Sequence, residues 1–164
     1  MAWMRPGHLG DVTVEHTAYH LPIIIRDFLR DAFAQNPSRA ATPAFISDLL
    51  CHSMTSLDDA IAGDVLELFP GGLESLPTLS NDHIQKTIND IHRGGVNYKK
   101  ARLCMYGTTA LVALIDPQHE NLWLANLGDC QAGMSSGCVF HYTENSRPRR
   151  CSNGFYVFFA RLDY

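Results

Sequence analysis

The sequence predicts an α+β fold in which a largely helical first half is followed by a β-hairpin. Apolar residues recur at helical spacing through most of the first ninety residues. From Tyr106 onwards the chain instead reads GTTALVALI and LWLANLGDCQ, two apolar runs joined by DPQHEN. Because both runs are apolar almost throughout, we expect both faces of the sheet to be covered. Layers of helix, sheet, sheet and helix with antiparallel strands would satisfy this.

Length and composition narrow the class of protein. A chain of 164 residues with 46% hydrophobic residues is the size of one domain. Its net charge of -4 provides no basic field for nucleic acid or anionic lipid. Five scattered cysteines without a Cys-x-x-Cys pair argue against a disulfide framework and for a reducing compartment. We therefore expect an intracellular, cytoplasmic monomer without nucleic-acid or membrane partners, and mitochondrial import only if an N-terminal exon is missing.

Helix signals follow one another along the first half. An apolar stripe runs from Asp11 to Phe33, but Pro22 interrupts it, so we expect two helical pieces with Pro22 opening the second. Thr42-Pro43 is typical of a helix start. Ser56, with an acidic residue three positions on, has the spacing of a capping box that would begin a further helix.

Weaker signals come before and after the hairpin. Ser80 is expected to cap a short helix bearing Ile84, Ile88 and Ile91, which ends at Gly94-Gly95 in a left-handed conformation. The basic segment 98–102 is interpreted as a solvated stretch before the first strand. No secondary structure is predicted beyond Ala132, where the chain ends in an aromatic run.

The stretch from Gly107 to Gln131 carries the clearest functional signal. Its first strand begins Gly107-Thr108-Thr109-Ala110 and its second ends Asn126-Leu127-Gly128-Asp129. This pattern resembles the signature of type 2C (PPM-type) metal-dependent serine/threonine protein phosphatases, in which a Gly-Ser/Thr-Thr-Ala strand pairs with one ending in Asn-x-Gly-Asp. The resemblance implies that Asp129 binds a metal ion beside the central pair. An isolated Gly-Asp pair favours a turn aspartate that accepts hydrogen bonds from backbone N–H groups, and the resemblance brings the metal-binding role of Asp129 level with that interpretation.

A second resemblance lies near the N-terminus. Gly7-His8-Leu9-Gly10 is similar to the family's Asp-Gly-His-x-Gly element, where the aspartate bridges two metal ions and the next carbonyl oxygen binds one of them. The resemblance implies a metal-binding Gly7 and a catalytic His8, the histidine being the family's proposed general acid. Pro6 occupies the place of the aspartate and offers no side-chain ligand. The family's downstream metal-binding aspartates have no match either.

The resemblance also implies a function. Type 2C phosphatases hydrolyse phosphoserine and phosphothreonine in phosphoprotein substrates with water activated by two or more Mg²⁺ or Mn²⁺ ions, and no other cofactor is expected. Because carboxylates hold these ions, we expect this chain to be inactive or very weak. Residues 1–132 are interpreted as a truncated phosphatase domain with a partial type 2C fold, and 133–164 as a non-matching tail. Helix spacing hints at the pyruvate dehydrogenase phosphatase-like subgroup.

Three alternatives remain. In the first, the chain is a non-catalytic fragment that binds phosphoproteins or a phosphatase partner. In the second, it is an unstable product of a gene-model error whose apolar sheet faces stay uncovered. A transition-metal site at His16 and His20 is the third alternative. These histidines lack the His-Glu-x-x-His order and a third ligand, which favours an ordinary helix face.

Overall fold

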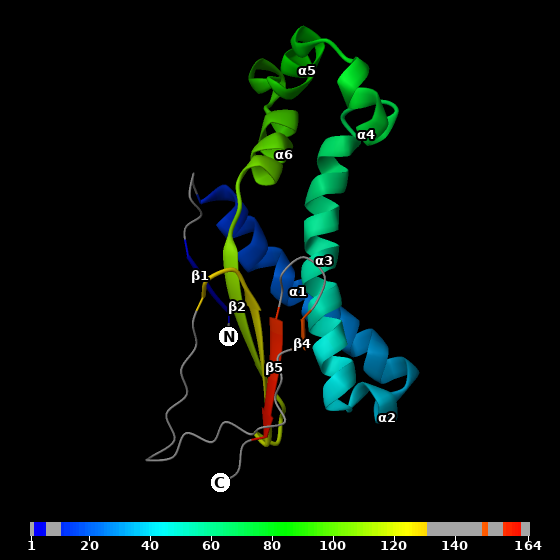
Figure 1. Ribbon diagram of the computed structural model, residues 1–164, viewed down its shortest axis with the longest axis vertical. Helices are drawn as coiled ribbons and strands as arrows, with labels where there is room; N and C mark the ends of the chain where they lie inside the picture. The colour runs from blue at the N-terminus through cyan, green and yellow to red at the C-terminus, as the bar shows by residue number, and fades with distance from the viewer. Residues whose placement is uncertain (1, 6–10, 131–148, 151–155, 162–164) are drawn as a thin grey trace.

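The computed structural model describes residues 2–5, 11–130, 149–150 and 156–161 (Figure 1). Its elements, in chain order, are β1 (Ala2–Arg5), α1 (Val12–Gln35), α2 (Pro37–Ala40), α3 (Pro43–Leu66), α4 (Gly72–Ser75), η1 (Leu76–Thr78), α5 (Asn81–Ile88), η2 (Ile91–Arg93), α6 (Val96–Met105), β2 (Thr109–Ile115), β3 (Asn121–Leu127), β4 (Arg149–Arg150) and β5 (Tyr156–Arg161). The fold is α+β, as predicted. Helices α1 and α3 lie on one face of the sheet, while α4 and α5 form a lobe beyond it (Figure 1).

The sheet has the strand order β1-β2-β3-β5-β4, and every pairing is antiparallel. The predicted hairpin of β2 and β3 is confirmed, with Ala110 opposite Leu127 and Ile115 opposite Leu122. The Asp116 carboxylate stabilises its turn, because it accepts hydrogen bonds from the N–H groups of residues 120 and 121. Strand β5 was not predicted. It adds the aromatic run to the free edge of β3, a long-range pairing that local sequence does not reveal.

The core lies between this sheet and the helices α1 and α3. The buried apolar side chains that form it are Leu21, Ile25, Ile46, Leu49, Leu50, Met54, Leu57, Val112, Trp123, Ala125 and Val157. The indole N–H of Trp123 also donates to the carbonyl oxygen of Pro43, at 3.2 Å, which ties the sheet to the start of α3.

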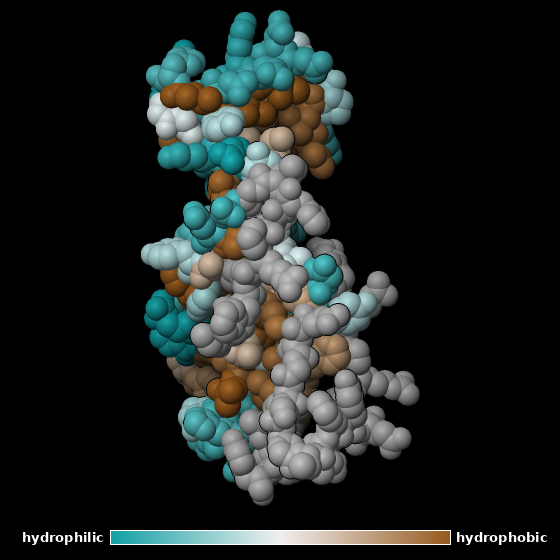
Figure 2. Space-filling model, turned by 90° about the vertical axis from the view of Figure 1, so that its left-hand side faces the viewer, coloured by the Kyte–Doolittle hydropathy of each residue, from teal (hydrophilic) through white to brown (hydrophobic). Residues whose placement is uncertain are grey.

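Side chains that alternate with these on the strands point away from the helices. Among them are Leu111, Ile115, Leu124 and Phe158, and the exposed fractions of Ile115 and Phe158 are 52% and 39%. Figure 2 shows hydrophobic residues on this side of the molecule at the height of the sheet. The second sheet that we expected over this face is not present in the part of the chain that the structure describes.

Two predicted helix boundaries are wrong. Helix α1 continues through Pro22, and α3 continues through Ser56. A proline inside a helix lowers the stability of the folded state by about 3 kcal/mol. Burial of Leu21 and Ile25 of α1 in the core offsets this, because each contributes about 1.5–3 kcal/mol of stability. Polar residues are also accommodated inside α3. The Ser53 hydroxyl donates a hydrogen bond to the carbonyl oxygen of Leu49 at 2.8 Å, so a serine in this segment need not begin a new helix.

Other local signals are confirmed or corrected. The hydroxyl oxygens of Thr42 and Ser80 cap α3 and α5 as predicted. Gly94 takes a left-handed conformation, with φ +106°, but it ends η2 because α5 already ends at Ile88. Segment 98–102 lies in α6, a helix that we did not predict.

The expectation of reduced cysteines is wrong at Cys51, which is disulfide-bonded, whereas Cys104 and Cys130 are free thiols. In the stretches that the structure describes, no helix combines the length and apolarity needed to cross a bilayer.

Candidate functional site

The hairpin motif lies at one end of the sheet. Strand β1 ends with Arg5 opposite Thr109, the first residue of β2, and β3 ends with Leu127 opposite Ala110. Residues 6–10 follow Arg5 directly in the sequence. Gly7 and His8 themselves lie outside the described residues, and their assigned roles stay predictions.

Gly128 determines the shape of this end. Its φ of +85° lies in the left-handed region, and a Cβ added there would stand 2.7 Å from Cγ2 of Thr109. The close approach explains why position 128 requires glycine. Asp129 follows this turn with an exposed side chain, as expected for a carboxylate at the end of a strand.

Asn126 holds the turn closed. Its side-chain Nδ2 donates to the carbonyl oxygen of Cys130 at 3.0 Å, and more weakly to that of Gly128 at 3.4 Å. Its Oδ1 is buried and has no hydrogen-bond partner within the described part of the chain. We did not predict this role of Asn126, although the Asn-x-Gly-Asp order contained the signal.

A cavity of about 380 Å³ adjoins the sheet end. The first turns of α1 form one wall, where the Thr13 hydroxyl donates a shared hydrogen bond to the carbonyl oxygens of Leu103 and Tyr106, at 3.2 and 3.0 Å. This bond fixes the start of α1 against the end of α6. The remaining lining is mostly apolar, and Asp58 is its one carboxylate. No sequence pattern indicates this cavity, because α1, α3 and α6 are far apart in the chain.

The described residues do not fit a two-metal centre. They contain no group of three histidine, cysteine, aspartate or glutamate side chains placed to hold an ion. We therefore derive no hydrolytic step through bound metal. The rings of His16 and His20 lie 4.2 Å apart on α1, but within the described chain they too lack a third ligand.

The environment of His16 is nevertheless distinctive. Burial lowers the pKa of His16 below its usual value, the neighbouring His20 lowers it further, and Asp64 only partly opposes them. His16 is half-buried on α1, whereas His20 is exposed. This agrees with the reading of an ordinary helix face.

Comparison with known families identifies the class of protein. A model of the protein phosphatase 2C family matches residues 61–150, more than half of the chain. The match includes the hairpin and its Gly128-Asp129 end, so the chain belongs to the protein phosphatase 2C family. Members of this family are hydrolases that dephosphorylate proteins and generally depend on Mg²⁺ or Mn²⁺. No curated protein and no solved structure gives a match.

The family match begins within α3 and extends past residue 132. The division into a phosphatase domain at 1–132 and a tail at 133–164 stays a prediction.

Proposed function

We propose that the nominal function of this chain is Mg²⁺- or Mn²⁺-dependent hydrolysis of phosphoserine and phosphothreonine in proteins, and that the 164 residues themselves turn over phosphoprotein negligibly. The expectation of negligible turnover rests on the sheet end. There, Asp129 is the one carboxylate that follows the Asn126-x-Gly128 turn. Pro6 supports it, because proline cannot supply the bridging carboxylate of the family's Asp-Gly-His element. Two cations need several carboxylates to offset their charge.

The finer assignments rest on the resemblance. Gly7 is proposed as a backbone metal ligand, His8 as the general acid and Asp129 as the ligand of an additional ion. The substrate is proposed to be a phosphoprotein, and the helix spacing supports the pyruvate dehydrogenase phosphatase-like subgroup. We propose that the chain works as a cytoplasmic monomer.

A phosphatase assay tests this proposal. The purified chain is incubated with a phosphothreonine peptide and millimolar Mn²⁺, and released phosphate is measured against a sample with EDTA. We expect release at background, and no change for Asp129→Asn or for the matched control Asp59→Asn, an exposed aspartate on α3. Sustained Mn²⁺-dependent release that falls in Asp129→Asn but not in Asp59→Asn would overturn the proposal of negligible turnover.

A second candidate function is a non-catalytic phosphatase-like module that binds a partner protein. The uncharged outward face of β2, β3 and β5 favours it, because exposed apolar patches often mark interaction sites. Binding to a partner that persists in EDTA and is lost when a charge is introduced by Ile115→Lys would support this function. Absence of a cooperative thermal unfolding transition would instead support the reading as an unstable fragment.

A further inference from the structure

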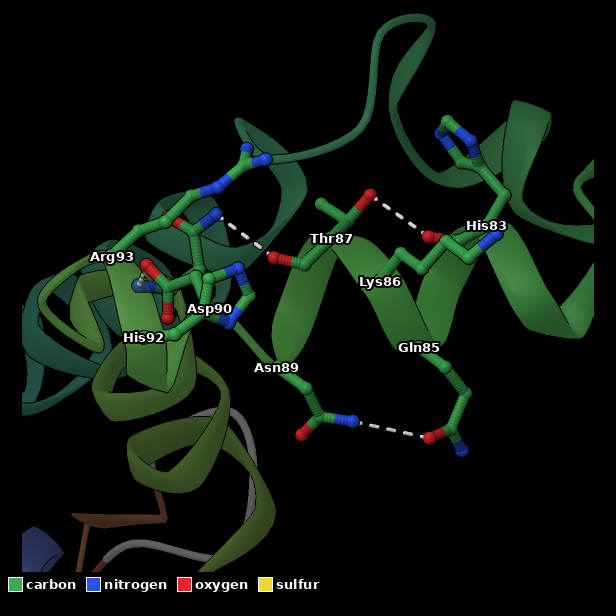
Figure 3. Close-up of a pocket in the computed structure, with 9 residues that line it drawn as sticks. His83, Gln85, Lys86, Thr87, Asn89, Asp90, His92 and Arg93 are labelled. Atoms are coloured by element: carbon green, nitrogen blue, oxygen red, sulfur yellow. Dashed lines mark hydrogen bonds between the residues drawn. The ribbon is translucent and has the colours of Figure 1, made fainter.

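A second hollow lies on the helical lobe, remote from the sheet end. It has a volume of about 600 Å³, and α5, η2 and the start of α6 line it. Figure 1 places α5 at the end of α6 that points away from β2. The lining residues are polar, namely His83, Gln85, Lys86, Thr87, Asn89, Asp90, His92, Arg93 and Asn97. Figure 3 shows His83 and Lys86 on α5, with His92 and Arg93 across from them on η2.

The two cations of this hollow are free to bind a ligand. Lys86 and Arg93 are exposed, and neither forms an ion pair with any residue that the structure describes. By contrast, Arg26 and Arg30 pair with neighbouring aspartates on α1, and Lys100 pairs with Asp64 at 3.0 Å. The hollow thus presents unneutralised positive charge on a protein whose net charge is -4.

The only carboxylate in the lining is already occupied. The two oxygens of Asp90 accept hydrogen bonds from the backbone N–H groups of Asn97 and Tyr98, both at 3.1 Å, so Asp90 caps the first turn of α6. The side chain of Asn97 donates to the carbonyl oxygen of Thr87 at 2.9 Å and joins α6 to α5. These bonds connect the walls of the hollow (Figure 3), and they already engage both oxygens of the Asp90 carboxylate.

We propose that this hollow binds the phosphate group of a phosphorylated serine or threonine in a peptide segment. A phosphate monoester carries about -1.5 to -2 charges at neutral pH, which matches one lysine and one arginine. The planar guanidinium of Arg93 suits two phosphate oxygens at once, while Lys86 acts as a point charge. His83 and His92 add N–H donors at the rim. Such a site would retain a phosphoprotein independently of the sheet end, so it does not rest on catalysis.

The test is a titration of the full chain with a phosphoserine peptide, followed by amide chemical shifts in the presence of EDTA. Because metal is removed, failure of the phosphatase proposal does not affect this readout. The unphosphorylated peptide and inorganic phosphate are titrated separately. We expect the phosphopeptide to bind at least about tenfold more tightly than the unphosphorylated peptide, with shifts in α5 and η2 and with affinity that falls as salt rises.

Variants of the lining residues test whether the hollow is the site of phosphopeptide binding. Lys86→Gln and Arg93→Gln should each weaken phosphopeptide binding by about fivefold or more, as expected for charge-assisted hydrogen bonds. Lys99→Gln removes an exposed lysine of α6 that does not line the hollow, and it should bind like the unmodified chain. Unchanged binding in Lys86→Gln and Arg93→Gln would overturn the proposal. Equal affinity for the unphosphorylated peptide, or for inorganic phosphate, would overturn it as well.

Discussion

The sheet with its two long helices and the helical lobe are held together by different forces. All members of the buried apolar cluster belong to α1, α3, β2, β3 or β5, whereas α4, η1, α5 and η2 contribute no buried residue. The lobe depends instead on hydrogen bonds, such as those of Ser80 and Asp90. A hydrogen bond contributes only about 1 kcal/mol net, while a buried leucine contributes about 1.5–3 kcal/mol. The lobe should therefore open locally before the sheet layer unfolds.

The largest expected effect is a cavity in the sheet layer. Leu50 on α3 is 0% exposed, so Leu50→Ala should lower the free energy of unfolding by about 2–5 kcal/mol. The matched change in the lobe is Leu73→Ala, where the side chain is 67% exposed and the effect should stay within about 0.5 kcal/mol. Urea denaturation measures both. Equal losses at the two positions would remove the distinction between the regions.

The next effect concerns the sheet end. Gly128→Ala should cost about 1–3 kcal/mol, because alanine is strained at positive φ and its Cβ would collide with Thr109. Gly63→Ala is the control: Gly63 lies inside α3 with no atom within 4 Å of an added Cβ, so this change should stabilise the chain by about 0.5–1 kcal/mol. Thr109→Ser removes Cγ2 and should recover part of the lost stability in the Gly128→Ala background. Similar stabilities of the two alanine variants would contradict the geometry.

A smaller and local effect is expected in the lobe. Partial burial alone would raise the pKa of Asp90, but hydrogen bonds from the N–H groups of Asn97 and Tyr98 outweigh it and hold the pKa below its usual value. Asp90→Asn weakens the cap, so amide hydrogen exchange should speed up across residues 81–98 while the global urea midpoint hardly moves. In the unmodified chain the contribution of Asp90 is complete above the usual carboxyl pKa and is lost as pH falls through the lowered one. Exchange that accelerates equally in β3 would contradict a local role.

The smallest effect is the pH dependence of His16. Its pKa is lowered on folding, so the unfolded chain binds a proton at higher pH than the folded chain does. Stability should therefore decline as the pH falls below about 6.5, the usual pKa of histidine. His16→Gln should flatten this decline in urea midpoints measured between pH 5 and 8. An unchanged slope in this variant would show that other groups cause it.

The same contrast explains what the sequence could predict. The caps at Thr42 and Ser80 and the β2-β3 hairpin depend on neighbouring residues, and these predictions are confirmed. Errors arose where distant packing overrides local preference. Helix α1 crosses Pro22 because its face is buried against α3, and β5 forms because β3 offers a free edge.

The candidate site divides in the same way. The place of Asp129 after a glycine turn at a strand end followed from the motif. The motif did not predict the contact of Gly128 with Thr109 or the cavity behind the sheet end. Both depend on segments that the fold brings together.

Within the described residues, the sheet end of this phosphatase-family chain offers the carboxylate of Asp129 but no group of three side chains that could hold an ion. Mn²⁺ titration, followed by paramagnetic broadening of amide signals, tests it most directly. The prediction is at most one weakly bound ion, with broadening centred on residues 126–130 that disappears in Asp129→Asn and persists in Asp59→Asn. Two tightly bound ions, or binding that Asp129→Asn leaves unchanged, would contradict the claim.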